Sequence, residues 1–256
     1  MTNVAGGSFL HKMFLPKLFL GGIIMSNEAL ASKSSKKVDI KKLAVLAIFI
    51  AFGYISLYVF RFKVSFLTLD FKDVFITMAG FVYGPAAAAL VAAVETVLEL
   101  FTVATTGFWG AIMNFAGSAA FAVTASLIYK YRRSFSGAII GLVSAVFAMT
   151  AVMLVMNMVI TPIYTGADLK TVIGMIMPLL LPFNLTKAIL NAAVTFIVYK
   201  PLSQALKGAS VIPASDSNFK IGKKTVAGVV IAAVIVAASI AVLIGLFGGT
   251  FEFVKK

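Results

Sequence analysis

The chain has 256 residues, of which 61% are hydrophobic and 12% charged, and its formal net charge is +13. A soluble domain is closer to half apolar and a quarter charged, so the composition excludes a soluble globular enzyme and a disordered chain. It predicts an all-α, polytopic membrane protein with room for six to eight spans of about 20 residues each.

Residues 1–40 form a basic tail before the first predicted span. The apolar run Met13–Met25 contains Lys17 and is too short to cross a bilayer securely. The small residues of Ala29–Ser35 leave a signal peptide open. We favour the alternative that translation starts at Met25, because the segment that follows is polar and basic, like a cytoplasmic leader.

Apolar runs almost free of charge predict seven helices. Residues 74–94 are long enough for one span, but Gly84-Pro85 in the middle is a strong helix breaker. A break there puts the basic clusters at 36–42 and 130–133 on the same side of the membrane, as the positive-inside rule requires. The predicted helices are 43–60, 70–84, 85–102, 109–129, 136–161, 171–199 and 225–247.

Prolines set the limits of two of these helices. We expect the fifth helix to stop before Pro162, and Pro178 and Pro182 to disturb the first half of the sixth. The predicted organisation is a tail at 1–40, a six-helix core at 41–203, a cytoplasmic linker at 204–224, and an extra transmembrane helix with a short outside tail at 225–256.

The predicted topology places the N-terminus in the cytoplasm and the C-terminus outside. On this topology 15 of the 22 basic residues lie on the cytoplasmic side. That bias explains the positive charge without a nucleic-acid partner. The expected location is the cell membrane, with lipid as the surrounding partner.

Polar residues inside the spans are the candidate functional residues, because lipid cannot satisfy them. Lys187 is 13 residues before Lys200 and thus about 20 Å from the cytoplasmic end, in the outer half of the membrane. Asn184 and Asn191 share its helix face at i−3 and i+4. The inner half holds almost no charge, which predicts a pocket open to the outside and closed to the cytoplasm. The other polar residues of the outer half are Asp70, Asp73, Glu95, Glu99, Asn114 and Asn157.

Each of these residues also has a purely structural interpretation. Asp70 and Asp73 are well placed as caps of the second helix, where negative charge is favourable. Glu95 is a suitable counter-charge for Lys187, and the asparagines are suited to hydrogen bonds between helices. The convergence of the set is more informative than any single member.

No enzyme signature is found in the sequence. It has no cysteine, its one histidine is His11 in the tail, and it has neither a GxxxxGK[ST] phosphate loop nor an HExxH motif. Asp70 and Asp73 form a DxxD pair that suits Mg²⁺, but no second acidic motif supports it. We therefore expect no catalytic residues, no metal and no energy source within this chain.

Five motifs in the core are specific when taken together. They are an LDFxD sequence at 69–73, an FxxGP break at 81–85, a TTGxxGxxxNFxG run at 105–117, an NxxxxPxY pattern at 157–164 and a PFNxxK sequence at 182–187. With them, residues 41–203 resemble the substrate-binding S components of energy-coupling factor (ECF) vitamin transporters, and among these the riboflavin type.

The resemblance implies a function. Such an S component captures its vitamin from outside at high affinity and associates with a transmembrane coupling subunit and two cytoplasmic ATPases. ATP hydrolysis in those partners topples the S component and releases the vitamin inwards, so the chain itself needs no cofactor and is no enzyme. Ala47 and Ala51 match the AxxxA motif for docking to the coupling subunit, and small residues four apart allow close helix approach.

The resemblance also implies the binding residues. The positions matching Asn157, Asn184 and Lys187 contact the flavin in the riboflavin type. Asparagine offers a donor and an acceptor to the imide edge of a flavin, and lysine donates to its carbonyl or ribityl oxygens. A tricyclic ring needs an apolar, aromatic slot. The remaining candidates are Asn114, Glu95 and Asp70 as polar groups, and Trp109, Phe66 and Phe108 as aromatic groups.

Three departures leave the substrate open. Glu95 stands where lysine is frequent, Ala111 stands where glutamate is frequent, and the segment 61–63 is basic where acidic residues are usual. A different vitamin or heterocycle is therefore the first alternative. An ion-coupled secondary transporter is the second, although it predicts charges in both membrane halves. The third is an Mg²⁺-dependent phosphate-transfer enzyme built on Asp70 and Asp73.

Overall fold

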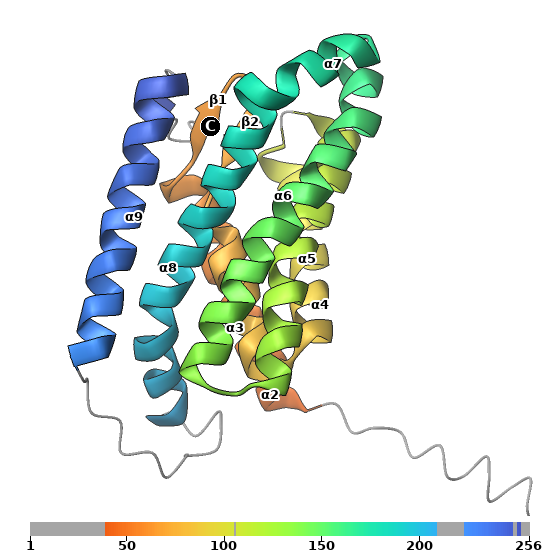
Figure 1. Cartoon of the computed structure of the whole chain (residues 1–256). Helices are drawn as coiled ribbons and strands as arrows, with labels where there is room; N and C mark the ends of the chain where they lie inside the picture. Colours follow the sequence, from red (N-terminus) through yellow and green to blue (C-terminus); the bar gives the residue numbers. More distant parts are fainter. Residues whose placement is uncertain (1–38, 105, 209–222, 248–249, 252–256) are drawn as a thin grey trace, which may run out of the picture. The chain divides into compact units, whose positions relative to one another are not determined.

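The computed structural model describes residues 39–104, 106–208, 223–247 and 250–251. The chain divides into two compact units, residues 1–40 and 41–256. The predicted tail and the proposed start at Met25 lie outside the described residues. The second unit is a helix bundle with a small antiparallel sheet at one end (Figure 1).

The helices follow the predicted order closely. The segment predicted as the sixth helix consists of α7, the π-helical η1 and α8 in direct succession. The elements are α2 (Ile40–Val59), β1 (Phe62–Val64), β2 (Leu67–Leu69), α3 (Lys72–Tyr83), α4 (Pro85–Thr102), α5 (Gly107–Tyr131), α6 (Phe135–Thr165), α7 (Leu169–Met175), η1 (Ile176–Leu180), α8 (Leu181–Gly208), α9 (Lys223–Phe247) and β3 (Thr250–Phe251).

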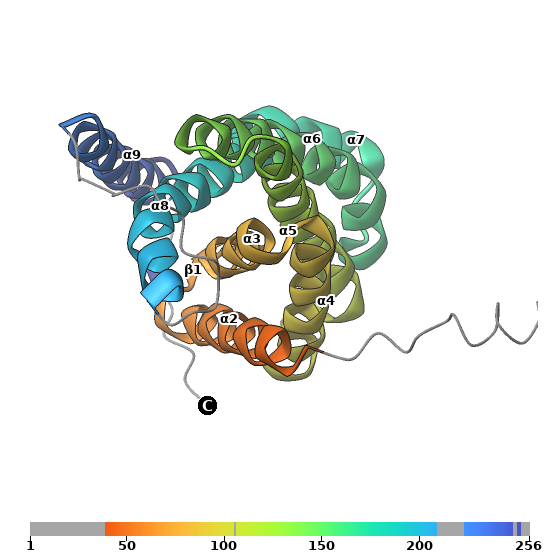
Figure 2. The ribbon, with the colours of Figure 1, turned by 90° about the horizontal axis from the view of Figure 1, so that it is seen from below.

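Six helical segments of the described chain are long and apolar enough to cross a membrane, and α3 is not among them. With 12 residues α3 is about 18 Å long, which is short of the roughly 30 Å hydrocarbon core. The helix predicted at 70–84 is therefore present, but it is too short to cross the membrane by itself. Figure 2 shows α3 inside a ring formed by the other core helices, and nine of its residues are buried.

The predicted break at Gly84-Pro85 is confirmed. Gly84 has a φ of 92°, in the region that favours glycine, and it separates α3 from α4. Pro85 begins α4, where its missing N–H costs no hydrogen bond. The break reverses the chain direction, so α3 and α4 pack as an antiparallel pair.

Aromatic rings close the end of the bundle near this break, which we call the opposite end. The ring of Phe81 lies 4.5 Å from that of Tyr129 and 5.7 Å from that of Tyr199, measured between centroids. The two tyrosine hydroxyls are 2.7 Å apart and share a hydrogen bond. This end also carries the α5–α6 connection, where Ser134 caps α6 by accepting from the Gly137 N–H.

A β-hairpin that the sequence did not predict lies at the other end, which we call the hairpin end. β1 and β2 pair with Phe62 opposite Leu69 and Val64 opposite Leu67. Ser65 takes a φ of 53° in the two-residue turn, a conformation more often adopted by glycine. β3 pairs with the free edge of β1, so the sheet order is β2-β1-β3.

Pro162 does not end α6, contrary to the prediction. The helix continues to Thr165, where Gly166 adopts a φ of 71° and donates its N–H to the Pro162 carbonyl at 3.0 Å. A proline so close to the end of a helix disturbs only the final turn, so the helix tolerates it. The extension carries Tyr164 on the helix and toward the hairpin end.

The predicted disturbance of the sixth helix is confirmed, but its predicted end was wrong. Pro178 lies in η1, where the backbone widens to a π-helix. α8 runs on to Gly208 instead of ending at Tyr199, and so occupies residues 204–208 of the predicted linker. Residues 209–222 of that linker lie outside the described residues.

Candidate functional site

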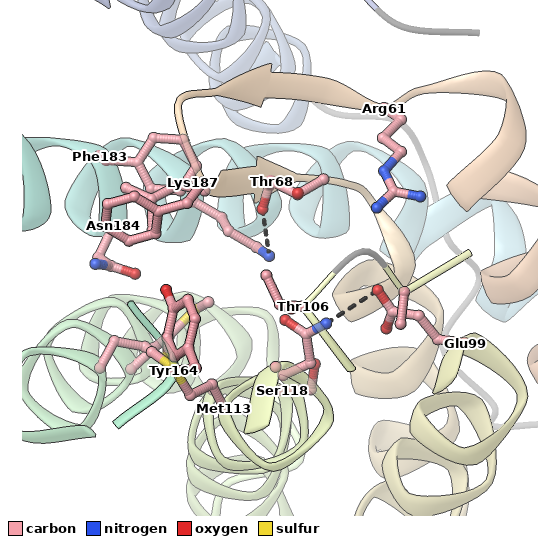
Figure 3. A pocket seen from close by; sticks show the side chains of 18 residues that line it. Arg61, Thr68, Glu99, Thr106, Met113, Ser118, Tyr164, Phe183, Asn184 and Lys187 are labelled. Carbon is pink, nitrogen blue, oxygen red and sulfur yellow. Dashed lines mark hydrogen bonds between the residues drawn. The ribbon is translucent and has the colours of Figure 1, made fainter. Parts of the chain in front are cut away.

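A polar cavity of about 60 Å³ lies at the hairpin end, between the hairpin, α5, α6 and α8. Its wall includes aromatic and methionine side chains, among them Phe66, Tyr164 and Phe183 (Figure 3). Groups from elements far apart in sequence meet there, as the prediction of a one-sided polar pocket requires. The polar groups of the wall include Arg61, Thr68, Glu99, Thr106, Asn114, Ser118, Asn184 and Lys187.

Lys187 joins α8 to the hairpin. Its Nζ donates to the Thr68 carbonyl at 3.1 Å and to Asp70 Oδ2 at 3.2 Å, and the residue is 6% exposed. The counter-charge of Lys187 is thus Asp70, whereas the sequence suggested Glu95. Asp70 itself is buried behind the lysine and is not part of the cavity wall.

Asparagines of α8 support this pair. The Asn191 amide donates to the Asp70 carbonyl at 3.1 Å and to the Lys187 carbonyl at 3.1 Å, which fixes the start of α3 against α8. Asn184 lies one turn before Lys187 on α8 and lines the cavity. Its Nδ2 donates to the Leu180 carbonyl at 2.7 Å. The predicted helix face of 184, 187 and 191 is confirmed as a buried face.

A second buried ion pair joins α3 to α4. Lys72 Nζ donates to Glu99 Oε2, and Asn114 Nδ2 of α5 donates to Glu99 Oε1 at 3.0 Å. The sequence placed Lys72 outside the membrane, at the outer end of the helix predicted at 70–84, but it is 1% exposed inside the bundle. No spacing signal links Lys72 to Glu99, because they are 27 residues apart on different helices.

Two further carboxylates are buried without a hydrogen-bond partner. Both oxygens of Asp73 and both of Glu95 lack one, and each residue has 0% exposure. The Glu95 carboxylate lies directly against Gly53 of α2, where even a Cβ atom has no room. Glu95 is not part of the cavity wall, so the structure does not bring it together with Asn184 and Lys187.

Other candidates lie elsewhere. Asn157 is fully buried, donates to the Met153 carbonyl at 2.7 Å and accepts from the Thr161 hydroxyl at 2.9 Å, so its amide is engaged within α6. Trp109 is 38% exposed and packs edge-to-face against Phe108. None of these three side chains belongs to the cavity wall.

Arg61 is a wall residue that the sequence reasoning did not select. Its Nη1 donates to the Val103 carbonyl at 2.9 Å, so it fastens the start of the hairpin to the end of α4. The residue is 8% exposed, and its guanidinium lies at the mouth of the cavity (Figure 3). The only sequence signal was the basic character of residues 61–63.

The AxxxA motif faces away from the bundle. Ala47 and Ala51 are exposed on α2, and so are Ile48, Phe52 and Ile55, each about half exposed. The two alanines thus lie on an exposed face of α2, at whose edge the ring of Phe52 stacks on that of Phe75 in α3 at 5.8 Å. Among the described residues no group of three His, Cys, Asp or Glu side chains is arranged to hold a metal ion.

Comparison with known proteins places these features in context. The family model "ECF transporter, substrate-specific component" matches residues 41–199. The chain is 33% identical to the riboflavin transporter RibU of Staphylococcus aureus (strain TCH60) over 178 residues, which is 65% of this chain and 93% of that one. It is 27% identical to the riboflavin transporter FmnP of Bacillus subtilis (strain 168) over 192 residues, 68% of this chain and all of that one.

A solved structure agrees with the sequence matches. It is described as the structure and mechanism of the S component of a bacterial ECF transporter. It matches with a TM-score of 0.57 and 31% identity, over 65% of this chain and 98% of that chain. The family model ends at residue 199, so α9 and β3 lie beyond it.

Proposed function

The chain belongs to the substrate-specific components of ECF transporters, and from this premise we propose that it captures riboflavin at its hairpin end for import. The observation that carries the proposal is the cavity wall formed by Asn184, Lys187 and Asn114 in a chain whose riboflavin-transporting relatives align along nearly their whole length. The relatives are transporter components, and we propose that this chain likewise catalyses no reaction.

The chemistry of the wall suits a flavin. Lys187 and Arg61 donate hydrogen bonds to carbonyl or ribityl oxygens, and Asn184 and Asn114 offer both donors and acceptors to an imide edge. Phe66, Tyr164 and Phe183 provide flat and apolar surfaces for the ring system. We propose Asn184, Lys187 and Asn114 as direct contacts. A role for Asn157, Glu95, Asp70 or Trp109 stays a prediction.

Ligand binding requires the cavity to widen. Pockets that hold ligands of this size measure about 300–1,000 Å³, whereas this cavity measures about 60 Å³. The hairpin is the element best placed to move, because it supplies three wall residues. Two side-chain hydrogen bonds connect it to the bundle, from Lys187 to the Thr68 carbonyl and from Arg61 to the Val103 carbonyl. Opening therefore exchanges bonds of the hairpin for bonds to the ligand.

The orientation follows from the distribution of charge. Lys41, Lys42, Arg132, Arg133 and Lys200 gather toward the opposite end of the described bundle. By the positive-inside rule that end faces the cytoplasm, so the hairpin end faces the outside in the cell membrane. The closed aromatic cluster is then on the cytoplasmic side.

The energy for transport must come from partners. We propose that the exposed Ala47 and Ala51 face of α2 docks against a transmembrane coupling subunit, which two cytoplasmic ATPases drive. On this proposal the chain has no cofactor of its own, and its other partners are riboflavin and lipid.

Titration of riboflavin with the purified protein in detergent tests the proposal. We expect saturable quenching of flavin fluorescence at nanomolar concentrations, and about tenfold or more weaker binding in Lys187→Ala and Asn184→Ala. Lys200→Ala is the matched control on the same helix, since Lys200 lies at the opposite end against the ring of Phe135. Full-affinity binding by both cavity variants would refute this cavity as the site. Absence of quenching by the unaltered protein would instead point to another vitamin.

A further inference from the structure

The hairpin is held from a second side, by a part of the chain that lies beyond the family model. β3 pairs with β1 in antiparallel register, with Phe62 opposite Phe251 and Lys63 opposite Thr250. β1 thereby becomes the central strand of the sheet. β1 is thus paired on both edges, on one side with β3 and on the other with β2, which supplies Leu67 and Thr68 to the cavity wall.

The helix that precedes β3 is itself anchored. Leu243 of α9 is 2% exposed and belongs to the same apolar cluster as Phe62, Leu69 and Leu190. Near the start of α9, Gly228 has no side chain, so the ring of Phe196 on α8 packs closely against the α9 backbone. α9 therefore stands beside α8 along its length, as Figures 1 and 2 both show, and delivers β3 to the hairpin.

We propose that α9 and β3 form a tether that restrains the hairpin and so sets how fast the ligand enters and leaves the cavity. The proposal rests on the function proposed above. Opening must move β1 together with β2, because they are paired, and β1 cannot move freely while β3 holds its other edge. Leu243 and β3 thus do not contact the ligand. They influence its binding by holding the hairpin in place.

The tether predicts a kinetic signature. On this proposal the pairing with β3 is present with and without ligand and is lost only while the hairpin is open, so it slows opening for ligands that arrive and for ligands that leave. Loss of one net backbone hydrogen bond changes an equilibrium about fivefold. A chain that ends after Phe247 should therefore bind and release riboflavin at least about fivefold faster, with an equilibrium dissociation constant that changes less than about twofold.

A reversible cross-link provides the sharper test. The natural chain has no cysteine, and residues opposite each other in an antiparallel pair are close enough for a disulfide. In the full chain with Lys63→Cys and Thr250→Cys, oxidation should slow association and dissociation of riboflavin at least about fivefold, and reduction should restore both rates. The two single variants are the controls and should not respond to oxidation.

Packing is tested with neighbouring residues of α9. Leu243→Ala should raise the association and dissociation rates of riboflavin in parallel. Ile244 is 50% exposed, so Ile244→Ala should leave both rates unchanged. Rates that do not respond to the cross-link would overturn the tether. So would a truncated chain whose weaker binding comes from faster dissociation alone, because that pattern indicates general loss of structure.

A measurement without ligand separates this proposal from the proposed function. Hydrogen exchange of the amides at 62–69 should be faster in the chain that ends after Phe247 than in the full chain. The full chain could fail to bind riboflavin while exchange at 62–69 still differs between the two chains and the 63–250 disulfide still forms. That result would support the tether and refute riboflavin as the substrate. Equal exchange in both chains, or failure of the disulfide to form, would refute the tether.

Discussion

Replacement of Lys187 by methionine should separate the stability of the fold from its affinity for ligand. The side chain keeps its length but loses the charge that faces Asp70, and the bond to the Thr68 carbonyl is lost with it. Asp70 is 2% exposed, so its carboxylate then remains in the interior without a cation.

The expected cost follows from this geometry. At 3.2 Å and an effective dielectric constant of about 20, the two charges attract each other by about 5 kcal/mol before desolvation is counted. Removal of one partner from a buried pair costs about 3–5 kcal/mol, because the other charge stays buried. Asn191 still donates to the Asp70 backbone but not to its carboxylate. We expect the free energy of unfolding to fall by about 3 kcal/mol.

A second substitution identifies the source of that loss. Asp70→Asn in the Lys187→Met background removes the stranded charge and should recover most of the stability. It should not recover the affinity for riboflavin, which we expect to stay about tenfold weaker in both variants because the lysine donor is missing.

The assay combines denaturant unfolding in detergent with flavin fluorescence quenching on the same samples. A double variant as unstable as Lys187→Met would refute the argument from the ion pair. Recovery of affinity together with stability would show that Lys187 acts on the ligand only through the fold.

Three further outcomes are expected. Ala51→Trp should abolish uptake into cells that hold the ECF module while riboflavin affinity changes less than about twofold, and Val155→Trp, on an exposed face of α6, is the control; uptake by Ala51→Trp would exclude this face as the docking surface. Gly53→Ala should destabilise the protein by roughly 1–3 kcal/mol, because its Cβ meets the Glu95 carboxylate, and the further change Glu95→Ala should relieve that cost; a neutral Gly53→Ala would mean that the helices separate easily. Glu95→Gln should leave the free energy of unfolding at neutral pH within about 1 kcal/mol of that of the natural protein, since a carboxyl buried without a partner is most stable in its neutral form and the amide is neutral too; a larger loss would reveal a charged partner of the carboxylate.

The order and approximate bounds of the helices could be predicted, because a membrane helix is recognised from its own run of apolar residues. Apolar runs and the Gly84-Pro85 dipeptide predicted seven helical segments at nearly the observed positions. The spacing of the polar residues around Lys187 was also sufficient to predict a buried polar face. The short α3 was predicted at 70–84, close to its observed bounds, because Gly84-Pro85 marks its end.

The hairpin could not be predicted from its residues. Its strands have three residues each, and its turn is made by Ser65 and Phe66, which are not the glycine or asparagine of common two-residue turns. The surrounding bundle stabilises the strained turn by burying Phe62 and Leu69. Tertiary packing therefore decides a structure that local propensity does not favour.

The partners of the buried charges also depend on tertiary packing. Depth in the membrane suggested Glu95 for Lys187, but the rotation of α4 turns Glu95 toward Gly53 and leaves Asp70 to the lysine. Lys72 was predicted to lie outside the membrane, yet α3 starts inside the bundle and buries it against Glu99. A charge-free run shows that a helix crosses the membrane but not which of its faces points into the bundle. The existence of a pocket is therefore easier to predict than the residues that line it.

The aromatic cluster at the opposite end bears on the electrical integrity of the cell membrane. Four acidic side chains, Asp70, Asp73, Glu95 and Glu99, are buried within the bundle, and such groups are typical of proton and sodium pathways. Ions cross a membrane protein only where polar groups or water continue through its whole depth. The packed rings of Phe81, Tyr129 and Tyr199 interrupt that path near the opposite end. An idle copy of this protein should therefore not dissipate the ion gradients of the membrane that holds it.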